Sequence, residues 1–149
     1  MRIVIGSDHA GFPLKADVLA FIRSLGHEVA DVGSHTPEPV DFPDIARAVC
    51  GSIREGRADR GLMVCGTGVG AAIAANKVRG IRAAVCHDIH SAHQSVEHDD
   101  VNVMCIGAQI VGPWLARDLV AAFLAAKFEA ADEDYARRVQ KLHAMEDEA

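Results

Sequence analysis

The chain has 149 residues, of which 50% are apolar and 24% are charged, and we expect one globular domain over residues 1–149. Its formal net charge of −6 argues against a nucleic-acid partner, because no basic stripe is present to neutralise phosphates. No apolar run is long enough to cross a bilayer, so we expect no membrane partner either.

Short apolar runs alternate with longer helical patterns along the chain. Strands are predicted at residues 2–5, 28–32, 61–65, 82–86 and 103–106, and helices at residues 13–25, 43–55, 70–77, 88–97 and 113–126. Pro13 and Pro113 suit the first turn of a helix, where a backbone N–H is not needed. Gly26 suits the position just after a helix end. The alternation predicts an α/β fold with helices on both faces of a parallel sheet.

The last part of the chain, residues 131–149, has a further helical pattern. Tyr135, Val139, Leu142 and Met145 form its apolar stripe. Because nothing follows this helix in the predicted domain, we expect the stripe to cover a neighbouring element or a partner subunit.

The four cysteines are Cys50, Cys65, Cys86 and Cys105, and no two of them form a CxxC pair. This wide spacing indicates neither a disulfide framework nor a zinc knuckle. The first strand pattern begins at Arg2, so we expect no signal peptide. These features predict a cytoplasmic protein with reduced thiols.

The most informative segment is residues 61–77, where an apolar run ends at Cys65 and is followed by Gly66, Thr67, Gly68, Val69 and Gly70. In α/β sheets, ligands bind beyond the carboxyl ends of the strands. Glycines let backbone N–H groups approach a ligand closely, and a helix start favours negative charge. Cys65 is therefore a candidate base or nucleophile. The alternative interpretation is a tight turn that carries a buried structural cysteine.

Further polar side chains follow other predicted strands. Asp8 and His9 come after the first strand, and His87 comes after the fourth. Because parallel strands end at one edge of a sheet, we expect these residues to lie near Cys65. Each has an ordinary explanation by itself, such as a helix cap for Asp8, but their convergence on a glycine loop favours a functional site.

Three other chemistries can be tested on spacing. A cysteine phosphatase needs an arginine six residues after its cysteine, where this chain has Ala71, and a dinucleotide fold needs a GxGxxG motif, which is absent after the first strand. His87, His90 and His93 share a helical face that could bind a metal, but exposed histidines are the commoner explanation. Proton transfer on a small anionic substrate remains, with backbone N–H groups holding an enediolate. We expect it to need no metal and no organic cofactor.

Several blocks occur together and in one order. They are residues 6–12 with Lys15, 41–44, 65–70, 74–77, 80–83, 91–92, 97–100 with Asn102, and 137–139. In these blocks the chain resembles the ribose-5-phosphate isomerase B family, which includes the galactose-6-phosphate isomerase subunits. The resemblance implies a Rossmann-like three-layer α/β/α sandwich on a five-stranded parallel sheet, with an extra C-terminal helix. It also implies a homodimer or homotetramer that builds each active site from two subunits.

The resemblance further implies a role for each matching residue in converting ribose 5-phosphate to ribulose 5-phosphate. Cys65 would move the proton between C1 and C2. His98 would open the sugar ring, assisted by Asp8. The remaining implied site residues are Gly66, Gly68, Val69 and Gly70 with Thr67 at the enediolate, His9 and Arg138 at the phosphate, and Asp99 and Arg137 beside them.

Three positions depart from the family pattern. Phe42 stands where many members have tyrosine, and Asp99 replaces a usual asparagine. Asp134 occupies the place of a second arginine, for which the adjacent Arg137 could compensate. Two added negative charges near a phosphate would repel it. The alternatives are therefore the same chemistry on a tetrulose or hexose phosphate, or a binding module without turnover.

Overall fold

The computed structural model describes residues 1–148. Its strands are β1 (Arg2–Ser7), β2 (Glu28–Asp31), β3 (Arg60–Cys65), β4 (Ala83–Val85) and β5 (Val103–Gly107). Its helices are α1 (Phe12–Ser24), α2 (Phe42–Arg54), α3 (Val69–Ala75), α4 (Ile89–Asp99), α5 (Pro113–Ala125) and α6 (Glu133–Met145). No helix of this described part is long and apolar enough to cross a membrane.

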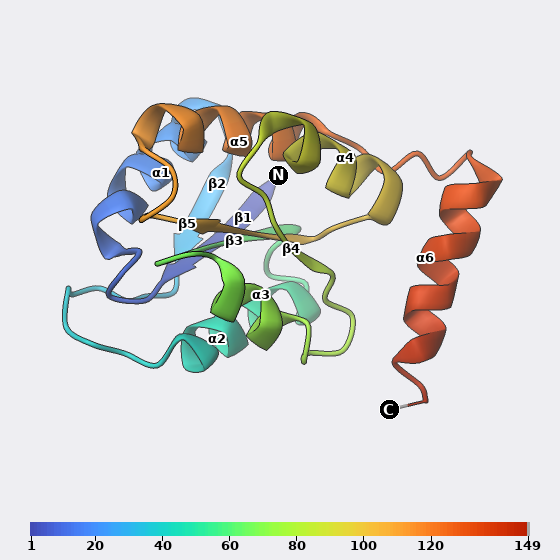
Figure 1. Ribbon diagram of the computed structural model, residues 1–149, viewed down its shortest axis with the longest axis horizontal. Helices are drawn as coiled ribbons and strands as arrows, with labels where there is room; N and C mark the ends of the chain where they lie inside the picture. The colour runs from blue at the N-terminus through green and yellow to red at the C-terminus, as the bar shows by residue number, and fades with distance from the viewer. Residues whose placement is uncertain (149) are drawn as a thin grey trace.

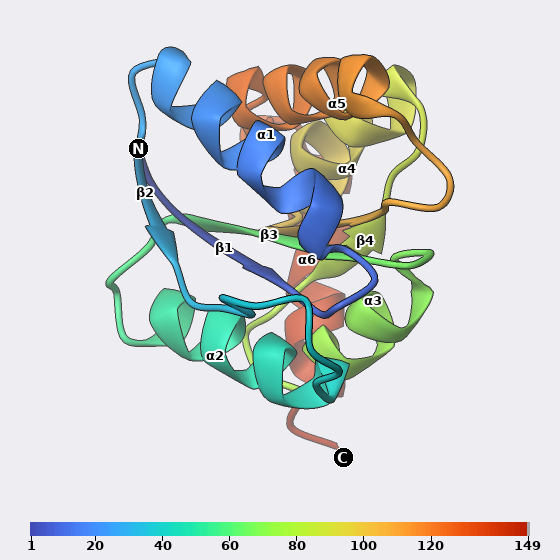
Figure 2. The ribbon, with the colours of Figure 1, turned by 90° about the vertical axis from the view of Figure 1, so that its left-hand side faces the viewer.

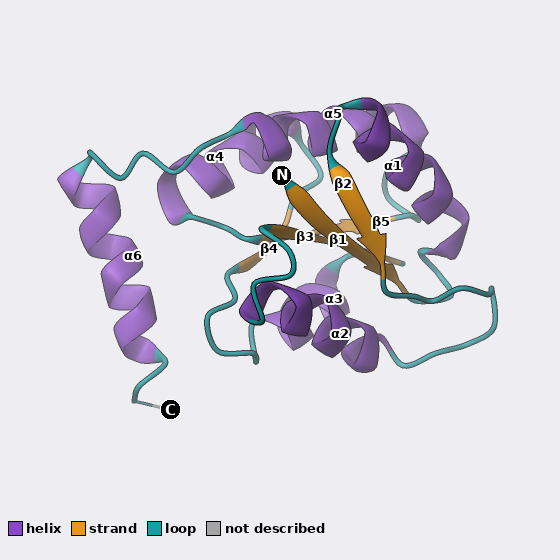
Figure 3. Cartoon of the chain, turned by 180° about the vertical axis from the view of Figure 1, so that it is seen from behind, coloured by secondary structure: helices purple, strands orange, loops and turns teal. Residues whose placement is uncertain are grey.

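The strands form one parallel sheet in the order β2-β1-β3-β5-β4. Helices α1, α4 and α5 cover one face, and α2 and α3 cover the other (Figures 1 and 3). Along β1, Ile3 and Ile5 belong to the first apolar cluster and Val4 to the second, as the two-residue period of a strand requires. The predicted fold class, with its three layers and extra C-terminal helix, is confirmed.

The predicted helix boundaries follow from local chemistry. Pro13 lies in the first turn of α1 and Pro113 in that of α5. Gly26 follows the end of α1 with a φ of 83°, a left-handed conformation that glycine adopts without strain. Its N–H donates to the carbonyl of Arg23, at 3.0 Å, and so satisfies one of the last helical acceptors.

The topology fixes which residues can meet. After β2 the chain crosses back past β1 to form β3, so a switch point lies between β1 and β3, where ligands bind in such sheets. Each connecting helix runs back against the strands, which places the end of α4 at the edge where β4 and β5 begin. Arg82, which directly precedes β4, confirms this position by pairing with Asp100 at 2.6 Å. Figure 1 shows α6 beside this amino edge, and Figure 2, viewed from the opposite end, shows it behind the sheet.

Candidate active site

Cys65 is the last residue of β3, and its side chain is buried, with 5% of the residue exposed. Its Sγ accepts the backbone N–H of Gly68 at 2.9 Å. Gly68 has a φ of 81°, which glycine tolerates, and this turn directs its N–H back to the sulfur. The Cys65 sulfur therefore faces a backbone donor at the start of α3.

The other thiols lie in environments that favour the neutral form. Burial raises the pKa of Cys50 to about 11 and raises that of Cys105 well above its ordinary value. Burial also raises the pKa of Cys86. These three cysteines therefore remain protonated core residues at neutral pH.

The turn after β5 holds the glycine loop in place. Ala108 donates its N–H to the carbonyl of Cys65 at 2.8 Å, and Gln109 donates to that of Gly66 at 3.0 Å. The side-chain amide of Gln109 also packs over Gly66, since a Cβ built there would meet its Oε1 at 3.2 Å. Gln109 belongs to no sequence motif and was not predicted as a site residue, although its place just beyond a strand end was a signal for it.

Asp8 and His9 lie at the same edge as Cys65, as predicted. Asp8 is buried, and its Oδ1 accepts the N–H of Gly11 at 2.9 Å. Gly11 lies directly on the end of β3, because a Cβ there would come within 1.9 Å of the carbonyl oxygen of Val64. His9 is exposed, and its Nδ1 accepts the N–H of Val40 at 3.3 Å, so its proton lies on Nε2 and is free to donate.

Thr67, Val69 and Gly70 complete the loop. Thr67 is exposed, and its Oγ1 accepts the N–H of Val69 at 3.3 Å. The ring of Phe42, at the start of α2, covers Gly70, where a Cβ would meet the ring at 3.0 Å. Phe42, which stands where many family members have tyrosine, therefore borders the glycine loop.

His87 also lies at this edge, where its Nε2 accepts the N–H of Gly107 at 2.9 Å. His90 and His93 are exposed on α4, and His93 lies 3.6 Å from Glu97. Within residues 1–148, no three histidine, cysteine or carboxylate side chains are grouped closely enough to hold a metal ion.

His98 and Asp99 lie elsewhere, at the end of α4. The ring of His98 stacks on that of Tyr135 from α6, with centroids 4.1 Å apart and planes at 22°. The side chain of His98 is 28% exposed. Asp99 is exposed and lines a groove of about 400 Å³, which Leu142 and Met145 of α6 also border. This arrangement joins α4 to α6 at the amino edge of the sheet.

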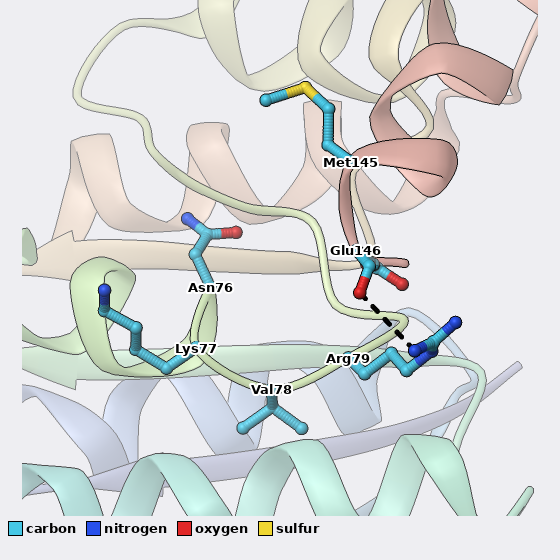
Figure 4. Close-up of a pocket in the computed structure, with 6 residues that line it drawn as sticks. All are labelled: Asn76, Lys77, Val78, Arg79, Met145 and Glu146. Carbon is cyan, nitrogen blue, oxygen red and sulfur yellow. Dashed lines mark hydrogen bonds between the residues drawn. The ribbon is translucent and has the colours of Figure 1, made fainter. Parts of the chain in front are cut away.

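Helix α6 carries the two arginines. Arg138 is exposed, and Arg137 pairs with Asp134 at 2.5 Å within the same helix. Arg137 was expected to compensate for the arginine that is missing at position 134. It is instead already paired with Asp134, the residue at that position. Figure 4 shows the end of α6, where the Glu146 carbonyl accepts from Arg79 at 3.4 Å.

The predicted residues thus fall into two groups. Asp8, His9, Cys65 and residues 66–70 lie at the carboxyl edge, whereas His98, Asp99, Arg137 and Arg138 lie on elements at the amino edge. A strand rises about 3.3 Å per residue, so the five residues of β5 separate the two edges by about 16 Å. Within one chain, Cys65 and His98 are not brought together.

A thiol, a glycine loop and a buried carboxylate at the switch point of a parallel sheet form a candidate enzyme site for a small anionic substrate. Residues 3–142 match the sequence model of the family described as Ribose/Galactose Isomerase. The chain is 41% identical to ribose-5-phosphate isomerase B of Escherichia coli over 97% of this chain and 96% of that one. It is 39% identical to D-erythrulose-4-phosphate isomerase of Pectobacterium atrosepticum, over 86% of this chain and 87% of the relative.

A solved structure is similar to this chain in both sequence and fold. Ribose-5-phosphate isomerase B of Clostridium thermocellum is 44% identical, with a TM-score of 0.96 and 99% of each chain covered. The chain therefore belongs to the ribose/galactose isomerase family and is an aldose–ketose isomerase of sugar phosphates.

Proposed function

We propose that this chain interconverts ribose 5-phosphate and ribulose 5-phosphate through an enediolate, with Cys65 as the base. The hydrogen bond from the Gly68 N–H to the Cys65 sulfur carries this assignment. It favours the thiolate at the carboxyl edge, where a sugar phosphate reaches it. A cytoplasmic location, expected from the cysteine spacing, is part of the same proposal.

The proposed reaction moves one proton from C2 to C1 and one from O2 to O1. The thiolate takes the proton from C2 of the open-chain aldose, and the electron pair of that bond forms the C1–C2 double bond of the enediolate. Backbone N–H groups of residues 66–70, with Thr67, hold the negative charge on oxygen. The thiol then returns a proton to C1, and the hydroxyl proton of O2 passes to O1, so that C2 becomes the ketone and C1 the hydroxymethyl carbon. A positioned base of this kind contributes about 10²- to 10⁴-fold to the rate.

Ring opening and phosphate binding require a second subunit in this proposal. His98 opens the furanose with help from Asp8, and Arg138 binds the phosphate with His9. Asp8 and Cys65 lie at one edge of the sheet and His98 at the other, so each site takes its two groups from different chains.

The free side of β4 suits such a pairing. A two-fold axis beside this edge strand would run the two sheets in opposite directions and place the carboxyl edge of one chain beside the amino edge of its partner. The elements on this side expose apolar residues, namely Val69, Ile73, Val85 and Ile89, which are 37–59% exposed. A partner subunit at this side would bury these apolar residues, which supports a homodimer. A homotetramer would contain two such dimers.

A tetrulose phosphate is the second candidate substrate. The pair between Arg137 and Asp134 removes one free cation from the phosphate site of the ribose reaction, and a D-erythrulose-4-phosphate isomerase is nearly as similar as the ribose enzyme. A different sugar could use Asp134 as a hydroxyl acceptor.

The test is turnover of pentose, tetrose and hexose phosphates in D₂O, followed by NMR. The proposal expects the largest kcat/KM with ribose 5-phosphate and deuterium bound to carbon in the product. A larger kcat/KM with D-erythrulose 4-phosphate would assign the tetrulose instead. Tight binding without turnover of any sugar phosphate would indicate a binding module.

A further inference from the structure

We propose that His87 is a positioning residue, which keeps Cys65 and the glycine loop after it (residues 66–70) in their reactive geometry while its imidazole is neutral. This inference rests on the proposed function of the Cys65 loop. His87 does not reach the reacting atoms in the proposal, and it acts through the backbone of β5.

The contact of His87 defines its protonation. Its Nε2 lies 2.9 Å from the backbone nitrogen of Gly107, the last residue of β5. A backbone N–H can only donate, so Nε2 must be the acceptor and the ring proton must lie on Nδ1. The hydrogen bond exists only while the imidazole is neutral.

Gly107 transmits this contact to the catalytic loop. It is the register partner of Cys65 across β3 and β5. A Cβ on Gly107 would come within 2.6 Å of the Thr67 Cα and 2.7 Å of the Gly66 carbonyl oxygen, so backbone packs directly on backbone. The next residue, Ala108, donates to the Cys65 carbonyl at 2.8 Å. A shift of Gly107 therefore moves the loop that carries the Cys65 thiol.

Protonation of His87 would break its hydrogen bond with the Gly107 N–H. A proton on Nε2 would face the Gly107 N–H with a second donor, and the hydrogen bond would be lost. The end of β5 would then be released from the turn after β4, and the alignment between the Gly68 N–H and the Cys65 sulfur would weaken. Activity should fall as the imidazole takes up a proton at acidic pH.

The groups beside His87 on its own turn do not titrate with it. Asp88 is hydrogen-bonded by the side chain and backbone of Ser91, which hold the pKa of Asp88 below its usual value. Burial raises the pKa of Cys86. Asp88 is therefore charged and Cys86 neutral across pH 5.5 to 8.5, and His90 is the remaining titratable neighbour in the first turn of α4.

The segments that contact Gly107 and Ala108 carry few charged groups. The turn after β5 carries Ala108 and Gln109, which are uncharged, and the loop after β3 contributes only the Cys65 thiol. The acid-side transition assigned to His87 can thus be separated from other titrations by comparing variants that differ at this residue alone.

The experiment uses two variants and one matched control. His87→Gln keeps an acceptor, Oε1, at the place of Nε2 but cannot be protonated in this range. His87→Leu keeps the bulk and removes the acceptor. His90→Gln makes the same chemical change at an exposed histidine three residues away. Circular dichroism and thermal melting establish that each variant is folded.

Two rates are measured from pH 5.5 to 8.5. The first is alkylation of Cys65 by iodoacetamide, followed by peptide mass spectrometry on substrate-free protein, and the second is kcat with its KM. We expect His87→Leu to lower kcat and Cys65 alkylation by about tenfold at pH 8, the effect of one lost hydrogen bond, with little change in KM. We expect His87→Gln to stay within about threefold of the wild type at pH 8 and to lose part of the acid-side decline. His90→Gln should match the wild type.

Three results would overturn the inference. They are wild-type rates in His87→Leu, an unchanged acid-side decline in His87→Gln, or equal losses in two folded His87 variants. If His87→Leu does not fold, the ¹⁵N shifts of His87 in the wild type decide, since a proton on Nε2 at pH 8 contradicts the contact. Alkylation needs no substrate, so the inference can hold even if the enzyme turns over no sugar phosphate, and that outcome would refute only the proposed function.

Discussion

The two edges of the sheet hold their polar residues in different ways. At the carboxyl edge, the Cys65 sulfur and the Asp8 carboxylate are buried, and each accepts a backbone N–H. The glycines beside them leave no room for a side chain, as at Gly11 and Gly107. At the amino edge, Arg137 and Arg138 of α6 are exposed, and Arg137 pairs with Asp134 of the same helix.

This difference affects how freely the residues at each edge can be substituted. Groups that are fixed by backbone contacts cannot change without disturbing β1, β3 or β5, so the proposed proton-transfer groups depend on the fold itself. Exposed side chains on α6 can change freely, because surface substitutions alter stability little. A ribose-5-phosphate isomerase B and a D-erythrulose-4-phosphate isomerase are nearly equal in identity to this chain, at 41% and 39%.

The largest effect is expected from the carboxyl edge. Cys65→Ala removes the base, so kcat should fall by about 10²- to 10⁴-fold while substrate affinity changes little. Steady-state kinetics and equilibrium binding of the substrate measure the two quantities. Cys50→Ala removes the same atom from a core thiol and should leave kcat unchanged. Full activity in Cys65→Ala would move the role of base to another residue.

Mixed dimers test whether the two edges of different chains form one site. Cys65→Ala and His98→Ala homodimers should both be nearly inactive. Co-expression with two affinity tags yields the mixed dimer, in which one of the two sites would combine an intact Cys65 with an intact His98. We expect about half the activity of a wild-type dimer. A mixed dimer as inactive as its parents would show that each site draws both residues from one chain.

Much of the carboxyl edge could be predicted from sequence. Buried strands read as apolar runs, and in a parallel sheet their ends converge, so Asp8, His9 and Cys65 were placed together correctly. The role of backbone donors could not be predicted, because the Gly107 N–H that binds His87 has no sequence signal. The same holds for Gln109, whose position depends on how the β5 turn packs on Gly66.

The amino edge was predicted less completely. The family resemblance assigns both His98 and Cys65 to the active site. The order of the motifs along the chain, however, does not say how far apart the two residues lie in space. The direction of α4 between two parallel strands places His98 at the opposite edge. The pair between Asp134 and Arg137 has the i, i+3 spacing of helical neighbours, so the sequence did contain a signal that Arg137 is engaged.

A smaller effect, dependent on the substrate, is expected from His98. His98→Asn removes the proposed ring-opening acid, so kcat/KM for ribose 5-phosphate should fall by about 10²-fold. Ribulose 5-phosphate cannot form the same furanose, and its enolisation, measured as deuterium uptake from D₂O, should fall by less than tenfold. Tyr135→Leu, which removes the stacking ring, should reproduce a fraction of the loss. Equal losses in both assays would assign His98 to the proton transfer itself.

The smallest effect concerns the charge at Asp134. Asp134→Asn releases Arg137 from its pair, and Asp134→Arg adds a second cation, so KM for ribose 5-phosphate should fall by a few-fold in the first variant and about tenfold in the second. Glu133→Gln removes a charge from the same exposed turn and is the matched control, with KM expected to stay constant. The salt dependence of KM should steepen with the added cation, because exposed charges are screened by ions.

The opposite effect of Asp134→Arg would contradict the pentose assignment. If Asp134→Arg abolishes turnover of the best substrate while Glu133→Gln does not, then Asp134 contacts that sugar directly. The pentose assignment would then be wrong, and the amino edge of this chain would have diverged toward another sugar phosphate.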